Sequence, residues 1–255
     1  MLKKHIPNIF TLLNLFSGMI AVLMATSGDL LWAAIWVFLG IFFDFFDGFF
    51  ARKFKVEGEL GKQLDSLADM VTSGVVPGIV MFQMMLFALN GSWFMELSTD
   101  TGNWKSLQET YHYGLPLIGL AIPLAAAFRL ANFNIDDRQS HSFIGLPTPA
   151  FSILILSLPL IVMFSGNSYV IGLLQNIYVL IAITLLGCYL MNAEISLFSL
   201  KFKHYSLKGN EFKYAYLLLT FLMLVTLKSI AIPLSILLYV LLSVVDNQIK
   251  KQGAH

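Results

Sequence analysis

The sequence contains two acidic segments that decide its interpretation: residues 44–52 read DFFDGFFAR, and residues 61–69 read GKQLDSLAD. In the first segment, Asp44 and Asp47 lie among phenylalanines and continue a long uncharged run. An acidic residue at the centre of a membrane helix costs about 2.5–3.5 kcal/mol on insertion scales, so such an acid is a functional candidate. The spacing of three residues puts both carboxylates on one face of a helix.

The second segment repeats this arrangement, with Gly61, Asp65 and Asp69 at successive intervals of four residues. These positions form one stripe along a helix. Only a short basic segment joins the two helices, so we expect them to be antiparallel neighbours whose acids face each other. Gly48 and Ala51, together with Gly61, are small residues that let two backbones, or a ligand, approach closely.

Four carboxylates gathered in a poorly hydrated place carry a charge of about −4, which needs protons or cations to balance it. The neighbouring sequence offers oxygen ligands without cysteine or histidine, a set that favours Mg²⁺, Mn²⁺ or Ca²⁺ over zinc. The segments therefore predict two divalent cations, an arrangement typical of phosphoryl transfer. In the alternative interpretation, the acids are interfacial and form salt bridges with the basic residues of the same segments.

The composition places this chain in a membrane. Of its 255 residues, 57% are hydrophobic and only 12% are charged, compared with about 25% charged residues in soluble domains. The net charge of +1 provides no large positive field, so we expect no nucleic-acid partner. The single cysteine, Cys188, cannot form an intrachain disulfide.

Long uncharged runs predict an all-α, polytopic integral membrane bundle of about eight transmembrane helices. The runs cover residues 9–26, 30–43, 70–95, 114–128, 144–193 and 214–245. We expect the fifth run to break at the turn-forming residues 165–168, the sixth to form a hairpin near Lys228, and Pro77 to kink its helix. The first run lacks a clear cleavage pattern and is interpreted as a retained span. Residues 1–255 are thus expected to form one membrane-embedded domain.

The basic residues predict the orientation, because Lys and Arg near membrane spans stay on the cytoplasmic side. With the N-terminus inside and eight spans, 14 basic residues fall on the cytoplasmic side and only Lys105 and Lys228 fall outside. The 14 are Lys3, Lys4, Arg52, Lys53, Lys55, Lys62, Arg129, Arg138, Lys201, Lys203, Lys208, Lys213, Lys250 and Lys251. This partition places both termini and the acidic segments at the cytoplasmic face.

The two segments together resemble a known family. The fixed positions Asp44, Asp47, Gly48, Ala51, Arg52, Gly61, Asp65 and Asp69 match the signature of the CDP-alcohol phosphatidyltransferases. Residues 7–14, 64–69 and 145–150 are further similar to the phosphatidylserine synthase branch of that family. The resemblance covers most of the first 150 residues.

The resemblance implies transfer of the phosphatidyl group from CDP-diacylglycerol to L-serine, which releases CMP. It implies a metal pair held by Asp44, Asp47, Asp65 and Asp69, with Asp65 and Asp69 catalytic and Asp69 the general base. Gly48 and Ala51 would line the cytidine site, Arg52 would lie near the diphosphate, and Gly61 would also bind CDP-diacylglycerol. A six-helix core, about residues 1–193, would carry two additional helices at about residues 214–245. The family also suggests a homodimer among the lipids of a prokaryotic cytoplasmic membrane.

Several polar residues have two possible roles. Asn8, Thr11 and Asn14 recur at helical spacing and either bind CDP-diacylglycerol or the acceptor, or form polar contacts between helices. Arg129 is either an interfacial arginine that extends to the headgroups or a fork for the serine carboxylate or a phosphate. Thr148 either contacts the acceptor or belongs to a proline-rich segment that only shapes the backbone.

Two alternative functions stay open at this point. The same chemistry could use another acceptor alcohol, such as glycerol 3-phosphate or inositol phosphate, which would require an additional basic pocket. A cation transporter could instead bind ions in transit at the four acids. That function predicts polar residues that continue through several helices toward the outer face.

Overall fold

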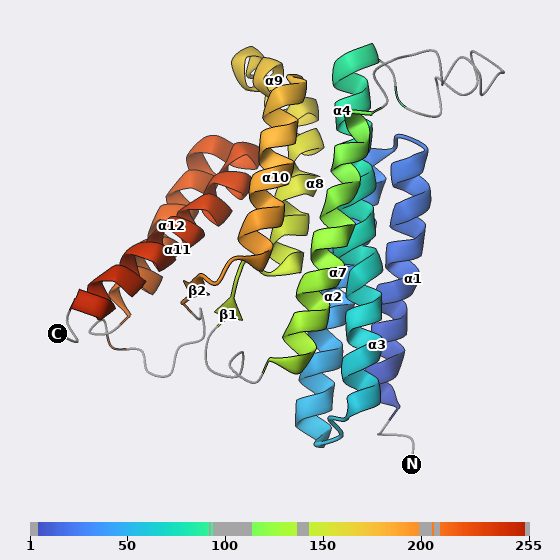
Figure 1. Cartoon of the computed structure of the whole chain (residues 1–255), viewed down its shortest axis with the longest axis vertical. Helices are drawn as coiled ribbons and strands as arrows, with labels where there is room; N and C mark the ends of the chain where they lie inside the picture. Colours follow the sequence, from blue (N-terminus) through green and yellow to red (C-terminus); the bar gives the residue numbers. More distant parts are fainter. Residues whose placement is uncertain are drawn as a thin grey trace.

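The computed structural model describes residues 5–91, 93, 114–136, 143–198, 206 and 210–252, and these form a helical bundle (Figure 1). Among them, the only strands are β1 (Phe143–Ile144) and β2 (Ser196–Leu197), which pair antiparallel. The all-α fold class is confirmed. Residues 94–113 lie outside the described residues, as do the basic residues Lys3, Lys4, Arg138, Lys201, Lys203 and Lys208. Lys105, which the charge partition placed outside, belongs to this undescribed segment.

The first two helices form an antiparallel pair, α1 (Ile6–Thr26) and α2 (Leu30–Phe54). The carboxylate of Asp29 accepts a hydrogen bond from the backbone N–H of Trp32 and so caps the start of α2. Lys55 adopts the left-handed conformation, with φ of 56°, and ends that helix. Because α2 continues eleven residues beyond the apolar run that ends at residue 43, the first acidic segment is helical, as expected.

The third span combines three helical pieces, α3 (Glu59–Asp69), the π-helix η2 (Met70–Val75) and α4 (Val76–Asn90). The π-helical turn lies directly before Pro77, for which sequence reasoning expected a kink. Proline lacks an N–H, and its ring clashes with the carbonyl four residues earlier in a regular α-helix. A wider turn relieves this clash, and it begins at the residue after Asp69.

The middle of the chain contains η3 (Pro116–Leu120), α7 (Ala121–Ile135), α8 (Thr148–Phe164), α9 (Ser168–Leu174) and α10 (Ile177–Asn192). The predicted break at residues 165–168 is confirmed, since Gly166 has a φ of +63° and Asn167 caps α9. A second break, which was not predicted from the sequence, separates α9 from α10, and the two helices meet at a bend of 68°. It occurs at Asn176, whose side chain accepts a hydrogen bond from the N–H of Tyr178 and starts a new helix.

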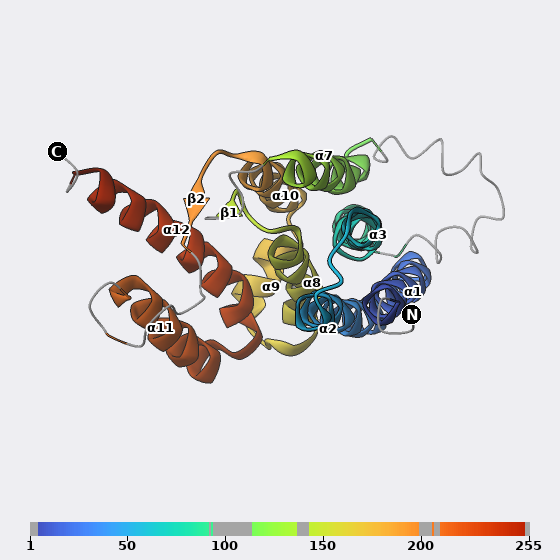
Figure 2. The same ribbon diagram turned by 90° about the horizontal axis from the view of Figure 1, so that it is seen from below.

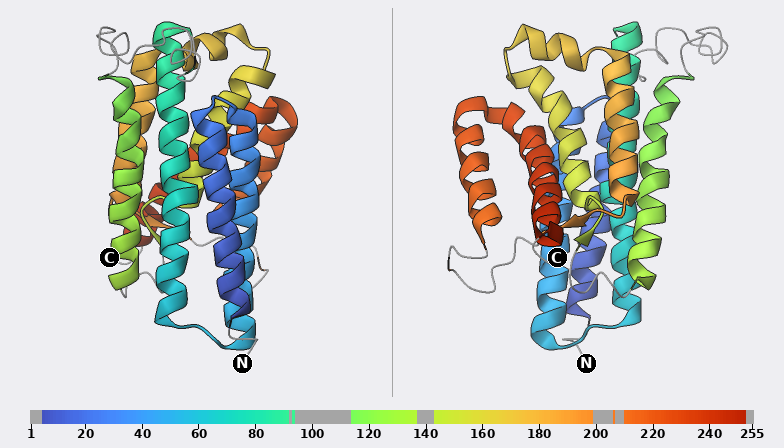
Figure 3. Two further views of the ribbon diagram at one scale, coloured as in Figure 1. Left: turned by 90° about the vertical axis from the view of Figure 1, so that its right-hand side faces the viewer. Right: turned by 60° about the vertical axis from the view of Figure 1, so that its left-hand side comes forward.

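The C-terminal part forms a hairpin of α11 (Glu211–Leu227) and α12 (Ala231–Gln252), joined by η5 (Lys228–Ile230). The predicted break near Lys228 is confirmed, with a φ of 50° at that residue. Helix α12 packs on α8 and β2, whereas α11 packs on α12. Figures 2 and 3 show this hairpin on the side of the bundle away from α1 and α3.

Five helical segments of the described chain are long and apolar enough to cross a membrane, and a sixth is present if the bent α9–α10 pair is one span. This number leaves out α8, an apolar helix of only 17 residues. It also counts residues 211–249, which contain α11 and most of α12, as one segment. The expected number of eight therefore depends on counting α8 and both arms of the C-terminal hairpin. The polytopic membrane architecture itself is confirmed.

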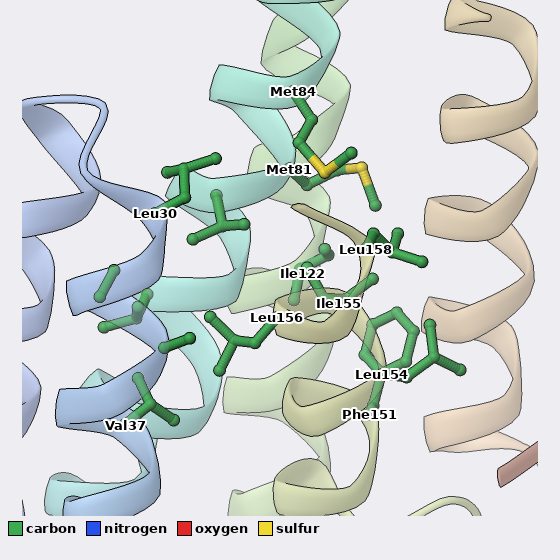
Figure 4. Close-up of a cluster of buried hydrophobic side chains, with 14 of the residues drawn as sticks. Leu30, Val37, Met81, Met84, Ile122, Phe151, Leu154, Ile155, Leu156 and Leu158 are labelled. Carbon is green, nitrogen blue, oxygen red and sulfur yellow. The ribbon is translucent and has the colours of Figure 1, made fainter. Parts of the chain in front are cut away.

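The buried core lies where α2, α4, α7 and α8 meet (Figure 4). Since lipid is as apolar as leucine, close packing rather than the hydrophobic effect holds membrane helices together. Glycines allow close approaches between helices: a Cβ on Gly119 would lie 2.7 Å from the backbone nitrogen of Phe82, and a Cβ on Gly78 would lie 2.6 Å from the Pro123 ring. These contacts fix η3 and α7 against α4.

Replacing Gly119 by alanine should separate these helices, because the neighbouring atom belongs to the backbone and cannot rotate away. We expect a loss of about 1–3 kcal/mol in stability, measured by thermal unfolding in detergent. Gly172→Ala is the matched control, since no atom lies within 4 Å of its added Cβ. Equal melting temperatures for the two variants would contradict the close approach.

Candidate active site

The acidic residues of α2 and α3 meet at one end of the bundle, as the sequence predicts. Both helices pack on α1 and are joined by the short turn at residues 55–58 (Figure 1). Carboxylate oxygens of Asp44, Asp47 and Asp65 lie within 4.8 Å of one another. Three negative groups at this separation repel each other strongly in a poorly hydrated environment.

The donor set of this triad fits a hard divalent cation. All three ligands are carboxylates, which suit Mg²⁺, Mn²⁺ or Ca²⁺. Oδ1 of Asp65 is buried without a hydrogen-bond partner, although buried polar atoms nearly always have one. Thr11 donates a 2.6 Å hydrogen bond to Oδ2 of Asp47 and so fixes the orientation of that carboxylate.

Asp69, the fourth acid of the predicted cluster, lies beside the triad. Its Oδ1 accepts a 3.2 Å hydrogen bond from Nδ2 of Asn14 on α1. Its carboxylate interacts electrostatically with the negative carboxylates of all three triad acids and with the positive guanidinium of Arg129. The structure therefore places this acid beside the triad but gives it polar partners of its own.

A cavity of about 560 Å³ opens beside the triad. Eight of the residues that sequence reasoning assigned to the site line it: Asn8, Thr11, Asp47, Gly48, Ala51, Arg52, Gly61 and Asp65. At Gly61, an added Cβ would meet only Oδ1 of Asn8, at 3.7 Å, so this glycine leaves its side of the cavity open. At Gly48, an added Cβ would lie 3.3 Å from Nη1 of Arg52 and would crowd the guanidinium.

Sequence reasoning missed several residues that line this cavity, among them Glu57, Glu59, Lys62 and Phe133. Phe133 follows Arg129 by four residues on α7, and this helical spacing could have placed it on the same face. Lys62 donates to the backbone carbonyl of Asn134 at 2.5 Å and thereby ties α3 to the end of α7. The two glutamates lie at the turn between α2 and α3, where helical spacing cannot predict the direction of a side chain.

A second cavity, of about 400 Å³, contains Arg129 in its wall. This arginine is only 8% exposed, and Nη1 donates to Oγ1 of Thr148 at 3.4 Å, while Nε has no partner. The structure thus brings together Arg129 and Thr148, two of the residues that sequence reasoning assigned to the acceptor. It places Asn14, the third, beside Asp69 instead.

The comparisons with known proteins agree with this geometry. Residues 4–188 match the sequence profile of the family described as CDP-alcohol phosphatidyltransferase. The CDP-diacylglycerol–serine O-phosphatidyltransferase of Helicobacter pylori J99 is 26% identical over 156 residues, which cover 59% of this chain and 55% of that protein. The protein of the same name from Bacillus subtilis is 30% identical over 150 residues, which cover 57% of this chain and 70% of that protein.

An archaeal relative, the archaetidylserine synthase of Methanothermobacter thermautotrophicus, is 24% identical over 154 residues, covering 60% of this chain and 56% of that protein. The chain thus spans about half the length of the Helicobacter and archaeal relatives. The family match covers most of the chain and includes both acidic segments. The chain belongs to the CDP-alcohol phosphatidyltransferase family.

Proposed function

We propose that this protein transfers the phosphatidyl group of CDP-diacylglycerol to the hydroxyl of L-serine and releases CMP. The observation that carries the proposal is the cavity beside the carboxylate triad, lined by eight residues of the two signature segments and α1. Relatives from Helicobacter, Bacillus and an archaeon, all with serine-type names, support serine as the acceptor.

The first cavity suits the nucleotide end of the donor. Gly48, Ala51 and Gly61 leave room for the cytidine, and the exposed Arg52 lies where it can pair with the diphosphate. Asn8 and Thr11 from α1 complete the polar wall. The acyl chains of the donor would remain in the surrounding lipid, because the outer surfaces of these helices are apolar.

The carboxylates would hold two divalent cations, with Asp44, Asp47 and Asp65 as the primary ligands. Asp69 would be a further ligand and would also act as the general base of the reaction. When bound, such cations neutralise the diphosphate and stabilise charge on the leaving oxygen. Thr11 keeps the Asp47 carboxylate in one orientation by its hydrogen bond. The chain therefore supplies a pre-oriented, oxygen-only ligand set.

In the proposed reaction, the serine hydroxyl oxygen forms a bond to the phosphatidyl phosphorus. The bond from that phosphorus to the bridging oxygen of CMP breaks, and CMP leaves with this oxygen. The hydroxyl proton passes to Asp69, which acts as the general base. Asp69 suits this role because it is held beside the triad, by Asn14 and the field of Arg129.

The second cavity supports an amino acid as the acceptor. Its described wall contains one cation, Arg129, two acids, Asp136 and Glu194, and the amides of Asn132 and Asn192. Serine carries a carboxylate for the arginine fork and an ammonium group for an acid. A phosphorylated alcohol would require an excess of basic groups, which these residues do not supply. This balance favours serine over glycerol 3-phosphate or inositol phosphate.

We further propose that the protein is a homodimer in the cytoplasmic membrane of a prokaryote, with both termini and the two cavities on the cytoplasmic side. The distribution of basic residues in the sequence supports this orientation. CMP and serine are water-soluble, so an active site near that face gives both of them direct access.

Purified protein supplied with CDP-diacylglycerol and Mg²⁺ or Mn²⁺ should release CMP only when serine is added. Glycerol 3-phosphate, inositol phosphate and glycerol serve as competing acceptors, and mass spectrometry identifies the lipid product. Asp47→Asn, which removes a triad carboxylate, is the inactive control. Release of CMP with a phosphorylated acceptor but not with serine would reassign the substrate.

Asp69→Asn should lower kcat by about 10²–10⁴-fold, because the amide cannot accept the serine proton. Equilibrium binding of CDP should change by less than about threefold, since Asp69 does not line the first cavity. A loss of turnover together with unchanged binding of CDP would support Asp69 as the general base. A variant with near-normal kcat would remove Asp69 from that role.

Arg129→Lys should raise the KM for serine about tenfold, equivalent to about 1.4 kcal/mol, because lysine cannot form the bidentate fork. The KM for CDP-diacylglycerol should stay constant. Arg52→Lys is the matched comparison and should show the reverse pattern, since Arg52 lines the donor cavity. An unchanged KM for serine in Arg129→Lys would place the acceptor elsewhere.

A further inference from the structure

Asn14 occupies an unusual position for an amide in a membrane helix. It is fully buried on α1, and Nδ2 donates to Oδ1 of Asp69, at the far end of α3 from the α2–α3 turn. Asn14 lines neither of the two cavities described above. Its contact with the site is therefore made through Asp69 rather than through space open to a ligand.

Asn14 is itself held in place from two sides. Oγ1 of Thr72 donates to the backbone carbonyl of Asn14 at 3.3 Å. On the other side, an added Cβ on Gly40 of α2 would lie 2.8 Å from Oδ1 of Asn14 and 2.8 Å from Cγ2 of Thr72. Three helices thus approach closely around this one amide, and a side chain at residue 40 would prevent the arrangement.

The π-helical turn contributes to this arrangement. It begins at the residue after Asp69 and contains Thr72, which also contacts Gly18 of α1 closely. A π-turn interrupts the regular register of a helix, and such turns occur frequently at functional sites. The same turn thus supplies the residue that holds Asn14 and follows directly on the acid that Asn14 binds.

We propose that Asn14 is a positioning residue for Asp69. Its amide group holds Oδ1, so that Oδ2 is presented in a fixed direction to the acceptor hydroxyl. This inference rests on the proposed role of Asp69 as the base. Without the amide, the carboxylate rotates freely about its terminal bond, and a misplacement of about 1 Å at a reacting group costs about 10²-fold in rate.

The test compares Asn14→Ala and the isosteric Asn14→Asp, which replaces the donor by a repelling oxygen. Both variants should lower kcat for acceptor-dependent CMP release about 10- to 100-fold. KM for CDP-diacylglycerol and the Kd for CDP should remain within about twofold. In the Asp69→Asn background, Asn14→Ala should have no further effect on kcat, because the group that it positions is already lost.

Gln83→Met is the matched control. Nε2 of Gln83 donates to the carbonyls of Ala25 and Thr26 and so joins α4 to α1 by a buried amide at the opposite end of the span. This variant should lower the melting temperature but leave kcat unchanged. A merely structural Asn14 would behave in the same way, with lower stability and a normal kcat, and that result would overturn the proposal.

If both Asn14 variants fail to fold, Thr72→Val replaces them, because it removes the hydrogen bond to Asn14 with little change in shape. It should lower kcat about 3- to 10-fold with an unchanged Kd for CDP, and a kcat equal to wild type would overturn the proposal. Failure of the proposed function can be distinguished from failure of the role proposed for Asn14, because the wild-type protein itself would then release no CMP with serine. If the wild-type protein used another alcohol, kcat of the variants would be compared with that acceptor instead. If no alcohol supported transfer, both proposals would be overturned.

Discussion

Repulsion among carboxylates in a poorly hydrated region is the constraint on which the rest of this structure depends. Three acids with oxygens within 4.8 Å of one another would be unstable beside lipid unless other charges balanced them. The chain provides only part of this balance, through the hydroxyl of Thr11 and the guanidinium of Arg52 beside Asp47. The amide of Asn14 and the guanidinium of Arg129 act on the neighbouring Asp69. The remaining charge is what a pair of divalent cations would neutralise, and an orphaned oxygen on Asp65 is consistent with such a ligand. Binding of metal and folding of this end of the bundle are expected to be coupled for the same reason.

Holding such a cluster requires a rigid framework, and in a membrane that rigidity comes from packing of small residues rather than from exclusion of water. The framework is strongest around η2, where Thr72 fits between Gly18 of α1 and Gly40 of α2. A second set of close contacts, at Gly78 and Gly119, fixes η3 and α7, and with them Arg129, against α4. The C-terminal hairpin takes no part in these contacts. It packs on α8 and β2, and both cavities are lined by residues from the first 194 positions.

The sequence predicted those features that depend on spacing along one helix or on strong turn formers. The face shared by Asp44 and Asp47, the break before α9 and the hairpin at Lys228 belong to this class. The meeting of the two acidic segments was predicted from their short connection, but other features of how separate helices pack could not be predicted from the sequence. The hydrogen bond that Asp69 accepts from Asn14, 55 residues earlier, depends on how α1 packs on α3. The π-turn was expected only as a kink at Pro77, because sequence shows where a helix must deform but not which deformation relieves the clash. The bend at Asn176 was missed because one polar pair in a long apolar run does not distinguish a helix cap from an exposed amide.

The two cavities are lined by different residues, and under the proposed function this division has a mechanistic consequence. Asp65 lines the first cavity, Arg129 lines the second, and Asp69 interacts with both of these residues. A displacement at phosphorus brings the nucleophile in opposite the leaving group, roughly in line. In the proposed reaction, the donor would occupy the first cavity and the acceptor the second, so that the two substrates would approach Asp69 from different cavities. In that proposal Asp69 would remove the acceptor proton. The groups that hold it, Asn14 and Arg129, belong to α1 and α7, which also contribute walls to the two cavities. Under the proposed function, the residues that hold Asp69 would thus also help to align the two substrates.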